Sequence, residues 1–203
     1  IGKITVGGEE IYILNTHLHA GFSSGSPYLD DLLTLRQRNE ITQADYDQRL
    51  NDVMEATLRR NEEVSKALSW LRDETNGGKP SILVGDFNAI EGSEEIRAIL
   101  DYQFIDSFRA TNPDSPGFTS DPITNPKNQH LVLNESDVQL RQDPLEVLDS
   151  KYARLPKRID YIFLSSHFQE NNIVKSVVTL NSANQDGIYP SDHSAVFTQI
   201  LLR

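Results

Sequence analysis

The stretch of residues 81–89, Ser-Ile-Leu-Val-Gly-Asp-Phe-Asn-Ala, organises the interpretation of this chain. It begins with a short apolar run typical of a buried strand, and the run ends at Gly85. Asp86 and Asn88 follow two residues apart, so both would lie on one face of a continuing strand. A carboxylate and a carboxamide there suit phosphate chemistry. Because Gly, Asp and Asn are also ordinary turn residues, the stretch taken alone favours a strand that ends in a polar turn.

The length and composition describe a globular protein. The 203 residues suffice for one sizeable core and at most two small domains. Hydrophobic residues make up 37%, and charges of both signs are spread along the chain, unlike a disordered sequence. No apolar run is long enough to cross a bilayer. The absence of cysteine excludes disulfides and thiolate metal sites but does not fix the cellular compartment.

The charge balance bears on possible ligands. There are 30 acidic and 19 basic residues, which gives a formal net charge of −11. A surface with this charge repels polyanions as a whole, so general salt-driven binding to a nucleic-acid backbone is disfavoured. A local basic groove remains compatible with this composition.

The order of the expected elements indicates an α/β protein. Residues 3–6 and 10–14 read as strands of a hairpin around Gly7-Gly8. Thr42 can cap a long helix in which apolar residues recur at helical spacing, and the helix leads into the strand at 81–86. Further strands are expected at 157–164, 173–180 and 195–202, a short helix at 93–100, a brief strand at 104–106, and a long irregular region at 112–156.

Four other polar residues are candidates for a functional site, and each also has an ordinary explanation. His17 follows an apolar strand, but a lone histidine is most often a hydrogen-bonded surface group. Asp160 shares a strand face with Ile162 and Leu164, where an unpaired carboxylate would be costly; a salt bridge would explain it. Asp192-His193 precedes the last strand, which suits a metal ligand beside a base, but the dipeptide is common.

The ordered set of polar segments is more informative than any member. Its members are Asn15-Thr16-His17, Gly85-Asp86-Phe87-Asn88, Arg158-Ile159-Asp160-Tyr161 and Ser191-Asp192-His193. The set resembles the endonuclease/exonuclease/phosphatase superfamily of metal-dependent phosphoesterases over residues 11–202. The resemblance implies an α/β fold of four layers, with two packed mixed β-sheets flanked by helices as in deoxyribonuclease I.

The resemblance also implies residue roles in an attack of water on a phosphoester. His193 is similar to the general base, and Asp160 to the carboxylate that fixes its tautomer. Asp86 resembles the acid that orients the nucleophile or serves the leaving group.

Three more roles concern charge on the phosphate. Asn88 and His17 resemble contacts to the phosphoryl oxygens. Asp192 resembles a ligand to a divalent cation, Mg²⁺ or Mn²⁺.

One departure from the family leads to a further expectation. Family members begin with a strand bearing Asn and a strand ending in Gln-Glu, and neither precedes Asn15 here. We therefore expect residues 1–203 to form the later portion of a single domain, incomplete at the N-terminus. By itself this portion is expected to bind metal poorly and to lack normal turnover.

Three stretches look most like the neutral-sphingomyelinase-like branch: His17-Leu18-His19-Ala20, the loop of residues 117–128 and the strand of residues 157–161. This resemblance favours a small-molecule or lipid head-group phosphoester as substrate. Nucleic acid is the alternative, because basic residues form one candidate cluster: Lys127, Arg141, Lys151, Arg154, Lys157 and Arg158. A binding scaffold that has lost catalysis is a second alternative.

Overall fold

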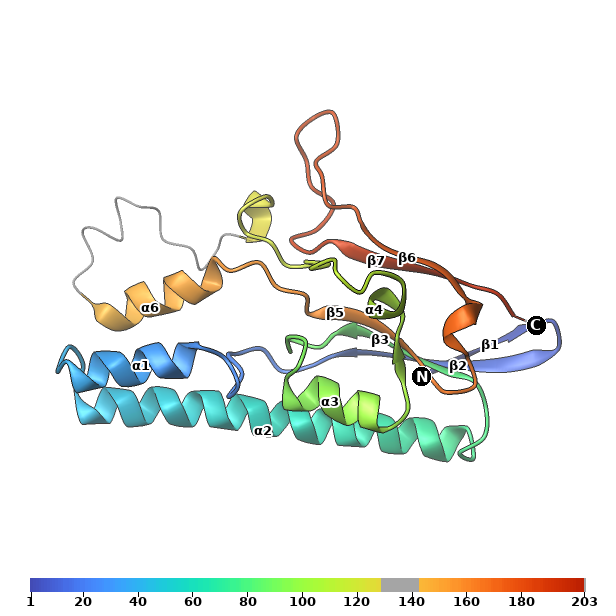
Figure 1. The fold of residues 1–203 in the computed structure, drawn as a ribbon, viewed down its shortest axis with the longest axis horizontal. Helices are drawn as coiled ribbons and strands as arrows, with labels where there is room; N and C mark the ends of the chain where they lie inside the picture. Colours follow the sequence, from blue (N-terminus) through green and yellow to red (C-terminus); the bar gives the residue numbers. More distant parts are fainter. Residues whose placement is uncertain (129–142, 203) are drawn as a thin grey trace.

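Two β-sheets pack against each other in the computed structural model, which describes residues 1–128 and 143–202 (Figure 1). The larger sheet is mixed and has the order β1 (Gly2–Val6), β2 (Glu9–His17), β3 (Ser81–Asp86), β5 (Asp160–Leu164) and β4 (Ile105–Asp106). The smaller sheet pairs β6 (Ile173–Thr179) with β7 (Ala195–Ile200) in antiparallel fashion. The expected α/β fold with two sheets is confirmed, although the smaller sheet is antiparallel and not mixed.

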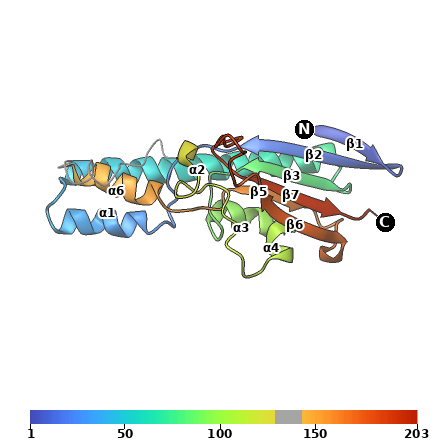
Figure 2. The same cartoon turned by 90° about the horizontal axis from the view of Figure 1, so that it is seen from above.

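Most of the helices lie on the side of the larger sheet that is turned away from β6 and β7 (Figure 1). In Figure 1 the longest helix, α2, runs below the sheet, and the view from above in Figure 2 shows α1 and α6 gathered beyond one end of the strands. The helical segments are α1 (Tyr28–Gln37), α2 (Gln43–Glu74), α3 (Glu94–Asp101), α4 (Ser107–Thr111) and α6 (Pro144–Ala153), with 3₁₀ turns at η1 (Pro126–Asn128) and η2 (Glu170–Asn172). Within the described ranges, none of these helices has the length and apolar character needed to span a membrane.

The local signals of the sequence account for the first half of the fold. Gly7 and Gly8 both have positive φ angles, which allows the tight turn between β1 and β2. Thr42 and Asp45 form a reciprocal capping box at the start of α2. The expected hairpin and helix start are therefore confirmed.

Apolar side chains fill three clusters that fix the relative positions of the layers. The main core lies between the larger sheet and the helices α2 and α3, and Leu83, Phe87 and Phe163 are fully buried in it. A second cluster joins α1, α2 and α6. A third, which includes Leu164 and Ile173, lies between the two sheets. Burial of these surfaces is the main stabilising contribution to this arrangement.

The region expected to be irregular, residues 112–156, contains a helix. In α6 the Asp143 side chain caps the amide of Leu145, and Pro144 occupies the first turn, a combination that favours helix initiation. This part of the expectation was therefore wrong, and residues 129–142 lie outside the described ranges. β5 begins at Asp160, three residues later than expected.

Candidate active site

The register of the larger sheet places three of the predicted polar residues in one row. His17 at the end of β2 is the register partner of Asp86 in the parallel strand β3. Asp86 is in turn the register partner of Asp160 in the antiparallel strand β5. Register partners on adjacent strands project from the same face of a sheet. Three segments far apart in the sequence therefore deliver polar side chains to one edge of the sheet.

Gly85 permits this close approach of strands. Its φ is +137°, and a Cβ at this position would lie 1.8 Å from the carbonyl oxygen of Thr16. Only glycine avoids that clash without moving the backbone. The Gly-Asp pair at the end of β3 is thus needed to set Asp86 beside His17.

His193 reaches this row from the loop that precedes β7. Its Nδ1 lies 3.0 Å from Oδ2 of Asp160 and 3.9 Å from Oδ2 of Asp86. Nε2 of His17 lies 3.4 Å from the same Asp86 oxygen. The structure therefore brings together four of the six predicted residues: His17, Asp86, Asp160 and His193. We refer to these four side chains as the polar row.

Asn88 and Asp192 lie beside this group in different ways. Asn88 has a left-handed φ of 46°, its amide N–H donates to Asp86 Oδ1, and its side chain donates to the carbonyl of Leu18, both at 2.8 Å. The Asp192 carboxylate is exposed and accepts a hydrogen bond from the Ser191 hydroxyl at 3.1 Å. Asn88 is thus fixed to the row, whereas Asp192 contacts its own loop.

Two residues that sequence reasoning did not single out hold the loop of His193 in place. The Thr119 hydroxyl accepts from the backbone amides of Ile159 and Asp160, both at 3.1 Å, and its carbonyl accepts from the amide of Ser194 at 2.7 Å. Asn125 donates to the carbonyls of Ser191 and Asp192. Both side chains are almost fully buried, and both come from the region, residues 112–156, that was expected to be irregular.

Crowding of charge shifts the proton affinities in this group. The hydrogen bond with Asp160, together with the charges of Asp160 and Asp86, raises the pKa of His193 above its ordinary value of 6.5. Burial and then the nearby charge of Asp160 raise the pKa of Asp86 above that of a free carboxyl. Such shifts are typical of functional sites.

The same side chains could hold a divalent metal ion. Ligand atoms of Asp86, Asp160 and His193 all lie within 4.8 Å of one another, whereas Asp192 is not part of that group. Two carboxylates with an imidazole suit a cation that prefers oxygen ligands and tolerates nitrogen. The donor set therefore fits a divalent metal ion on chemical grounds.

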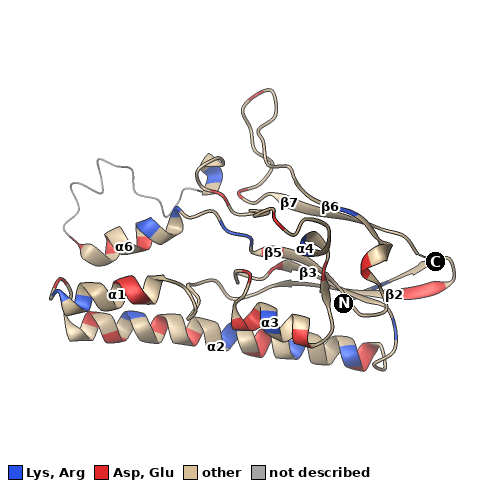
Figure 3. Cartoon of the chain, viewed as in Figure 1, with Lys and Arg blue, Asp and Glu red and all other residues tan. Residues whose placement is uncertain are grey.

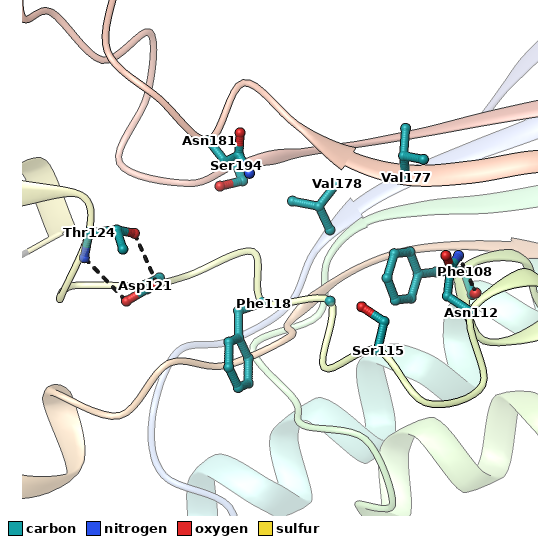
Figure 4. Close-up of a pocket in the computed structure, with 11 residues that line it drawn as sticks. Phe108, Asn112, Ser115, Phe118, Asp121, Thr124, Val177, Val178, Asn181 and Ser194 are labelled. Atoms are coloured by element: carbon teal, nitrogen blue, oxygen red, sulfur yellow. Dashed lines mark hydrogen bonds between the residues drawn. The ribbon is translucent and has the colours of Figure 1, made fainter.

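Two cavities adjoin the loop of residues 112–124. A cavity of about 640 Å³ is lined in part by Asn88 and His193 and extends to α6. A second, of about 450 Å³, lies between this loop and β6. Figure 4 shows Val178 and Ser194 on one side of it and Phe118 on the other. The second cavity contains none of the predicted catalytic side chains, so the first is the one that opens on the polar row.

The charged residues are distributed unevenly around this edge of the sheet. In Figure 3 basic and acidic residues alternate along α2, while a basic stretch leads into β5. That stretch is Lys157-Arg158, and the Arg158 guanidinium is buried against Asp106, with 2.6 Å between Nη1 and Oδ2. Only part of the expected basic cluster is thus available to a ligand.

A two-sheet α/β fold with acids and histidines gathered at one sheet edge defines a class of proteins suited to phosphoester chemistry. The chain belongs to the endonuclease/exonuclease/phosphatase family, because the model of that family matches residues 55–193. Enzymes of this family generally depend on a divalent metal ion. No match was found among curated proteins.

Solved structures share the fold at low sequence identity. Truncated TDP2 of Caenorhabditis elegans superposes with a TM-score of 0.57 at 17% identity, over 96% of this chain and 55% of that one. A variant of the 3′ phosphatase NExo from Neisseria, bound to a product DNA hairpin, gives a TM-score of 0.51 at 17% identity, over 98% and 64%. A family protein from Leptotrichia buccalis C-1013-b gives 0.51 at 18% identity, over 98% and 52%. The chain thus spans between about half and two thirds of the length of these structures.

Proposed function

We propose that this chain carries the reaction centre of a metal-assisted phosphoester hydrolase. The observation that supports the proposal most directly is the convergence of Asp86, Asp160 and His193 from three separate segments. Two carboxylates around one imidazole, at the mouth of a cavity, form an arrangement suited to activating water beside an anionic substrate. Family membership agrees with this reaction class.

In the proposed reaction His193 acts as the general base. The Asp160 carboxylate can only accept a hydrogen bond, so it holds the proton of the imidazole on Nδ1 and leaves Nε2 free to take a proton from water. As that proton moves to Nε2, the water oxygen forms a bond to phosphorus and the bond from phosphorus to the leaving oxygen breaks. The leaving oxygen then takes up a proton from water, while the Asp86 carboxylate, 3.9 Å from His193 Nδ1, helps to orient the attacking water.

Asn88 and His17 are proposed to bind the phosphoryl oxygens. One N–H of the Asn88 carboxamide donates to the Leu18 carbonyl, which orients the group and leaves the second N–H for a ligand. His17 is mostly exposed and is held against Asp86 at the open side of the row. Donors fixed in advance stabilise the charge that develops in the transition state without reorganisation.

A divalent cation, Mg²⁺ or Mn²⁺, is proposed to assist at the same place. When bound it would neutralise charge on the phosphoryl oxygens and lower the pKa of water. Asp86 is the best placed carboxylate to hold it, because Asp160 is engaged by His193. Asp192 is the second candidate, since it directly precedes His193 in the same loop.

The proposed substrate is a small or lipid-type phosphodiester in preference to nucleic acid. The net charge of −11 opposes general polyanion binding. Two members of the basic cluster are already paired, Lys151 with Asp31 and Arg158 with Asp106. A nucleic-acid substrate remains the second candidate, because NExo from Neisseria was solved with a DNA hairpin as product.

The test is hydrolysis by the intact protein, measured on sphingomyelin, plasmid DNA and a chromogenic phosphodiester, with Mg²⁺ or Mn²⁺ and with EDTA. We expect turnover of one of the first and third substrates that stops with EDTA and returns with added metal. Faster cleavage of plasmid DNA would favour the second candidate. No hydrolysis of any of them, or hydrolysis unaffected by EDTA, would refute the proposal and leave the binding scaffold as the explanation.

A further inference from the structure

The 640 Å³ cavity beside the polar row differs in character from the row itself. Asn88 and His193 line one part of it, and Leu155 and residues of α6 also contribute to its lining. We refer to it as the side cavity. A phosphoester whose phosphorus lies next to His193 can place one of its substituents there. The chemistry of the walls therefore bears on which substituent fits.

The walls of the side cavity are mainly apolar. Phe22, Ile90, Phe118 and Leu155 contribute to them. Phe118 and Leu155 are large apolar side chains that stay substantially exposed. Exposed apolar side chains that line a concave surface are typical of ligand sites, because single exposed apolar residues are normal but concave clusters are not.

Several polar side chains of the same walls already have partners. The Ser23 hydroxyl accepts from Arg60 at 3.2 Å, and the Ser26 hydroxyl accepts from the amide of Tyr28 at 3.2 Å. Asn128 donates to the Ser120 hydroxyl at 2.8 Å. Groups engaged in this way offer little to a nucleobase, which needs hydrogen-bond partners when it is desolvated. A hydrocarbon group has no such requirement.

A buried arginine holds one wall in place. Arg60 of α2 donates to the carbonyls of His19, Gly21 and Phe22, while its Nε lies 2.7 Å from Glu95 of α3. The loop that carries Phe22 is therefore fixed to two helices.

A second arginine holds the opposite wall. Arg109 donates to the carbonyls of Asn112, Pro113 and Ser115, and its other nitrogens contact Glu91 at 2.6 and 2.8 Å. A cavity with both walls held by ion-paired arginines is preformed, which lowers the cost of ordering a ligand in it.

Lys157 adds a cation to this apolar surface. Its side chain is half-buried, and its Nζ lies 5.9 Å from the centre of the Phe22 ring. In the described part of the chain no carboxylate lies within ion-pair distance of it. An ammonium in this setting favours an anionic ligand, and a phosphoryl oxygen at the cavity mouth would supply that charge.

We propose that the side cavity binds the hydrocarbon substituent of a phosphoester, with Lys157 contacting a phosphoryl oxygen of the same molecule. This inference rests on the proposed function and adds the place where the hydrocarbon substituent of the substrate binds. It assigns specificity to Leu155 and Phe118, which lie outside the polar row. The affinity for a phosphate-like ligand should therefore depend on the length of its hydrocarbon chain.

The test uses methyl-, butyl- and hexylphosphonate as probes, with dissociation constants measured by calorimetry on the intact protein. Burial of a methylene favours binding by about fourfold, so butylphosphonate should bind roughly 10–60 times more tightly than methylphosphonate. Leu155→Ser should reduce this ratio to about a third or less. Leu100→Ser provides the matched control: Leu100 is similarly exposed, at 41% against 46% for Leu155, but lies on α3 outside the cavity.

Lys157→Met separates the two parts of the proposed site. It should weaken the binding of all three phosphonates by a similar factor and leave the chain-length ratio unchanged. Affinity independent of chain length, an equal ratio in Leu155→Ser and Leu100→Ser, or tighter binding of thymidine 5′-monophosphate than of hexylphosphonate would overturn the inference.

A parallel assay with methyl p-nitrophenyl phosphate and Mn²⁺ distinguishes the two proposals. Hydrolysis of this ester together with chain-length-independent phosphonate binding would overturn the side-cavity inference alone. Chain-length-dependent binding without hydrolysis of this ester, or of the other substrates, would overturn the proposed function alone.

Discussion

Two groups of charged side chains in this molecule differ in their exposure to solvent and in their balance of charge. Arg60 and Glu95 are 0% and 1% exposed, and the guanidinium is surrounded by carbonyls and hydroxyls that accept its hydrogen bonds. Asp86, Asp160 and His193 are 17%, 20% and 24% exposed, and two carboxylates there share one imidazole. In the first group the two charges are balanced, and solvent or a ligand cannot reach them. The second has excess negative charge and access, which is what a cation and a phosphoester require.

The comparison indicates that two properties distinguish charged groups that stabilise the fold from charged groups that react. These properties are the number of hydrogen-bond and ion-pair partners and the accessibility to solvent. A buried pair with full partners contributes specificity of packing, and breaking it leaves an uncompensated charge. Accessible carboxylates that lie close together repel each other, and binding of a cation would reduce this repulsion. Substitutions in the two groups should therefore affect different measurements.

His193→Ala should have the largest effect on activity. Loss of a general base costs roughly 10²–10⁴-fold in kcat/KM, while removal of a partly exposed imidazole should change the free energy of unfolding little. Steady-state kinetics and chemical denaturation of the same preparation check both parts. A loss of less than threefold would remove His193 from the mechanism, and His19→Ala serves as the control histidine.

Arg60→Met should have the largest effect on stability. It leaves Glu95 buried without a cation and the loop carbonyls without donors, so we expect a loss of about 3–5 kcal/mol in the free energy of unfolding. Replacing Glu95 by Leu as well should recover the part that is due to the charge, but not the part that is due to the loop. A loss within about 1 kcal/mol in urea denaturation of Arg60→Met would contradict the structural role.

Asp160→Asn should lower the pKa of His193 from its raised value. Because that pKa is raised in the folded state, the contribution of His193 to the free energy of unfolding is complete below 6.5 and is lost as pH rises through the folded value. Activity should follow the neutral imidazole and increase over the same pH interval. Nuclear magnetic resonance titration of the metal-free protein measures the shift, and an unchanged His193 pKa in Asp160→Asn would contradict the pairing.

Glu10→Gln should have the smallest effect. Glu10 contacts Lys3 and Lys79 at the surface, and these contacts lower its pKa to about 2. The contribution to stability is present above the ordinary value of 4.5 and is lost as pH falls toward 2. Exposed pairs contribute little and are screened by salt, so the change in Tm should be far smaller than for Arg60→Met and should vanish in high salt. A decrease in Tm as large as that of Arg60→Met would refute the comparison.

Much of the fold and the membership of the polar row could be predicted from local sequence. The hairpin at Gly7-Gly8, the cap at Thr42 and the polar ends of the strands depend on short-range chemistry that a few adjacent residues specify. The ordered set of polar segments also predicted the family to which the chain belongs. The local sequence is therefore sufficient to predict His17, Asp86, Asn88, Asp160 and His193 as candidate site residues.

The supports of the site could not be predicted in the same way. Thr119 and Asn125 lie in a stretch without periodicity, and their partners are about 40 and 66 residues away in the sequence. Arg60 occupies a polar-looking position of α2, and only the packing of α3 and the loop after β2 buries it. The sheet register that aligns Asp86 with Asp160 likewise depends on tertiary contacts. Such long-range pairings leave no local pattern to read.

The most direct test of the account is a titration of the protein with Mn²⁺, followed by paramagnetic broadening of the histidine ring resonances. If the acids of β3 and β5 attract a divalent cation to the polar row, His193 and His17 should broaden at the lowest Mn²⁺ concentration, and Asp86→Asn should suppress this. His167, which contacts Ser165 beyond the opposite end of β5, is the internal reference. Broadening of His167 first, or equal broadening in Asp86→Asn, would contradict a cation-assisted reaction centre at this edge of the sheet.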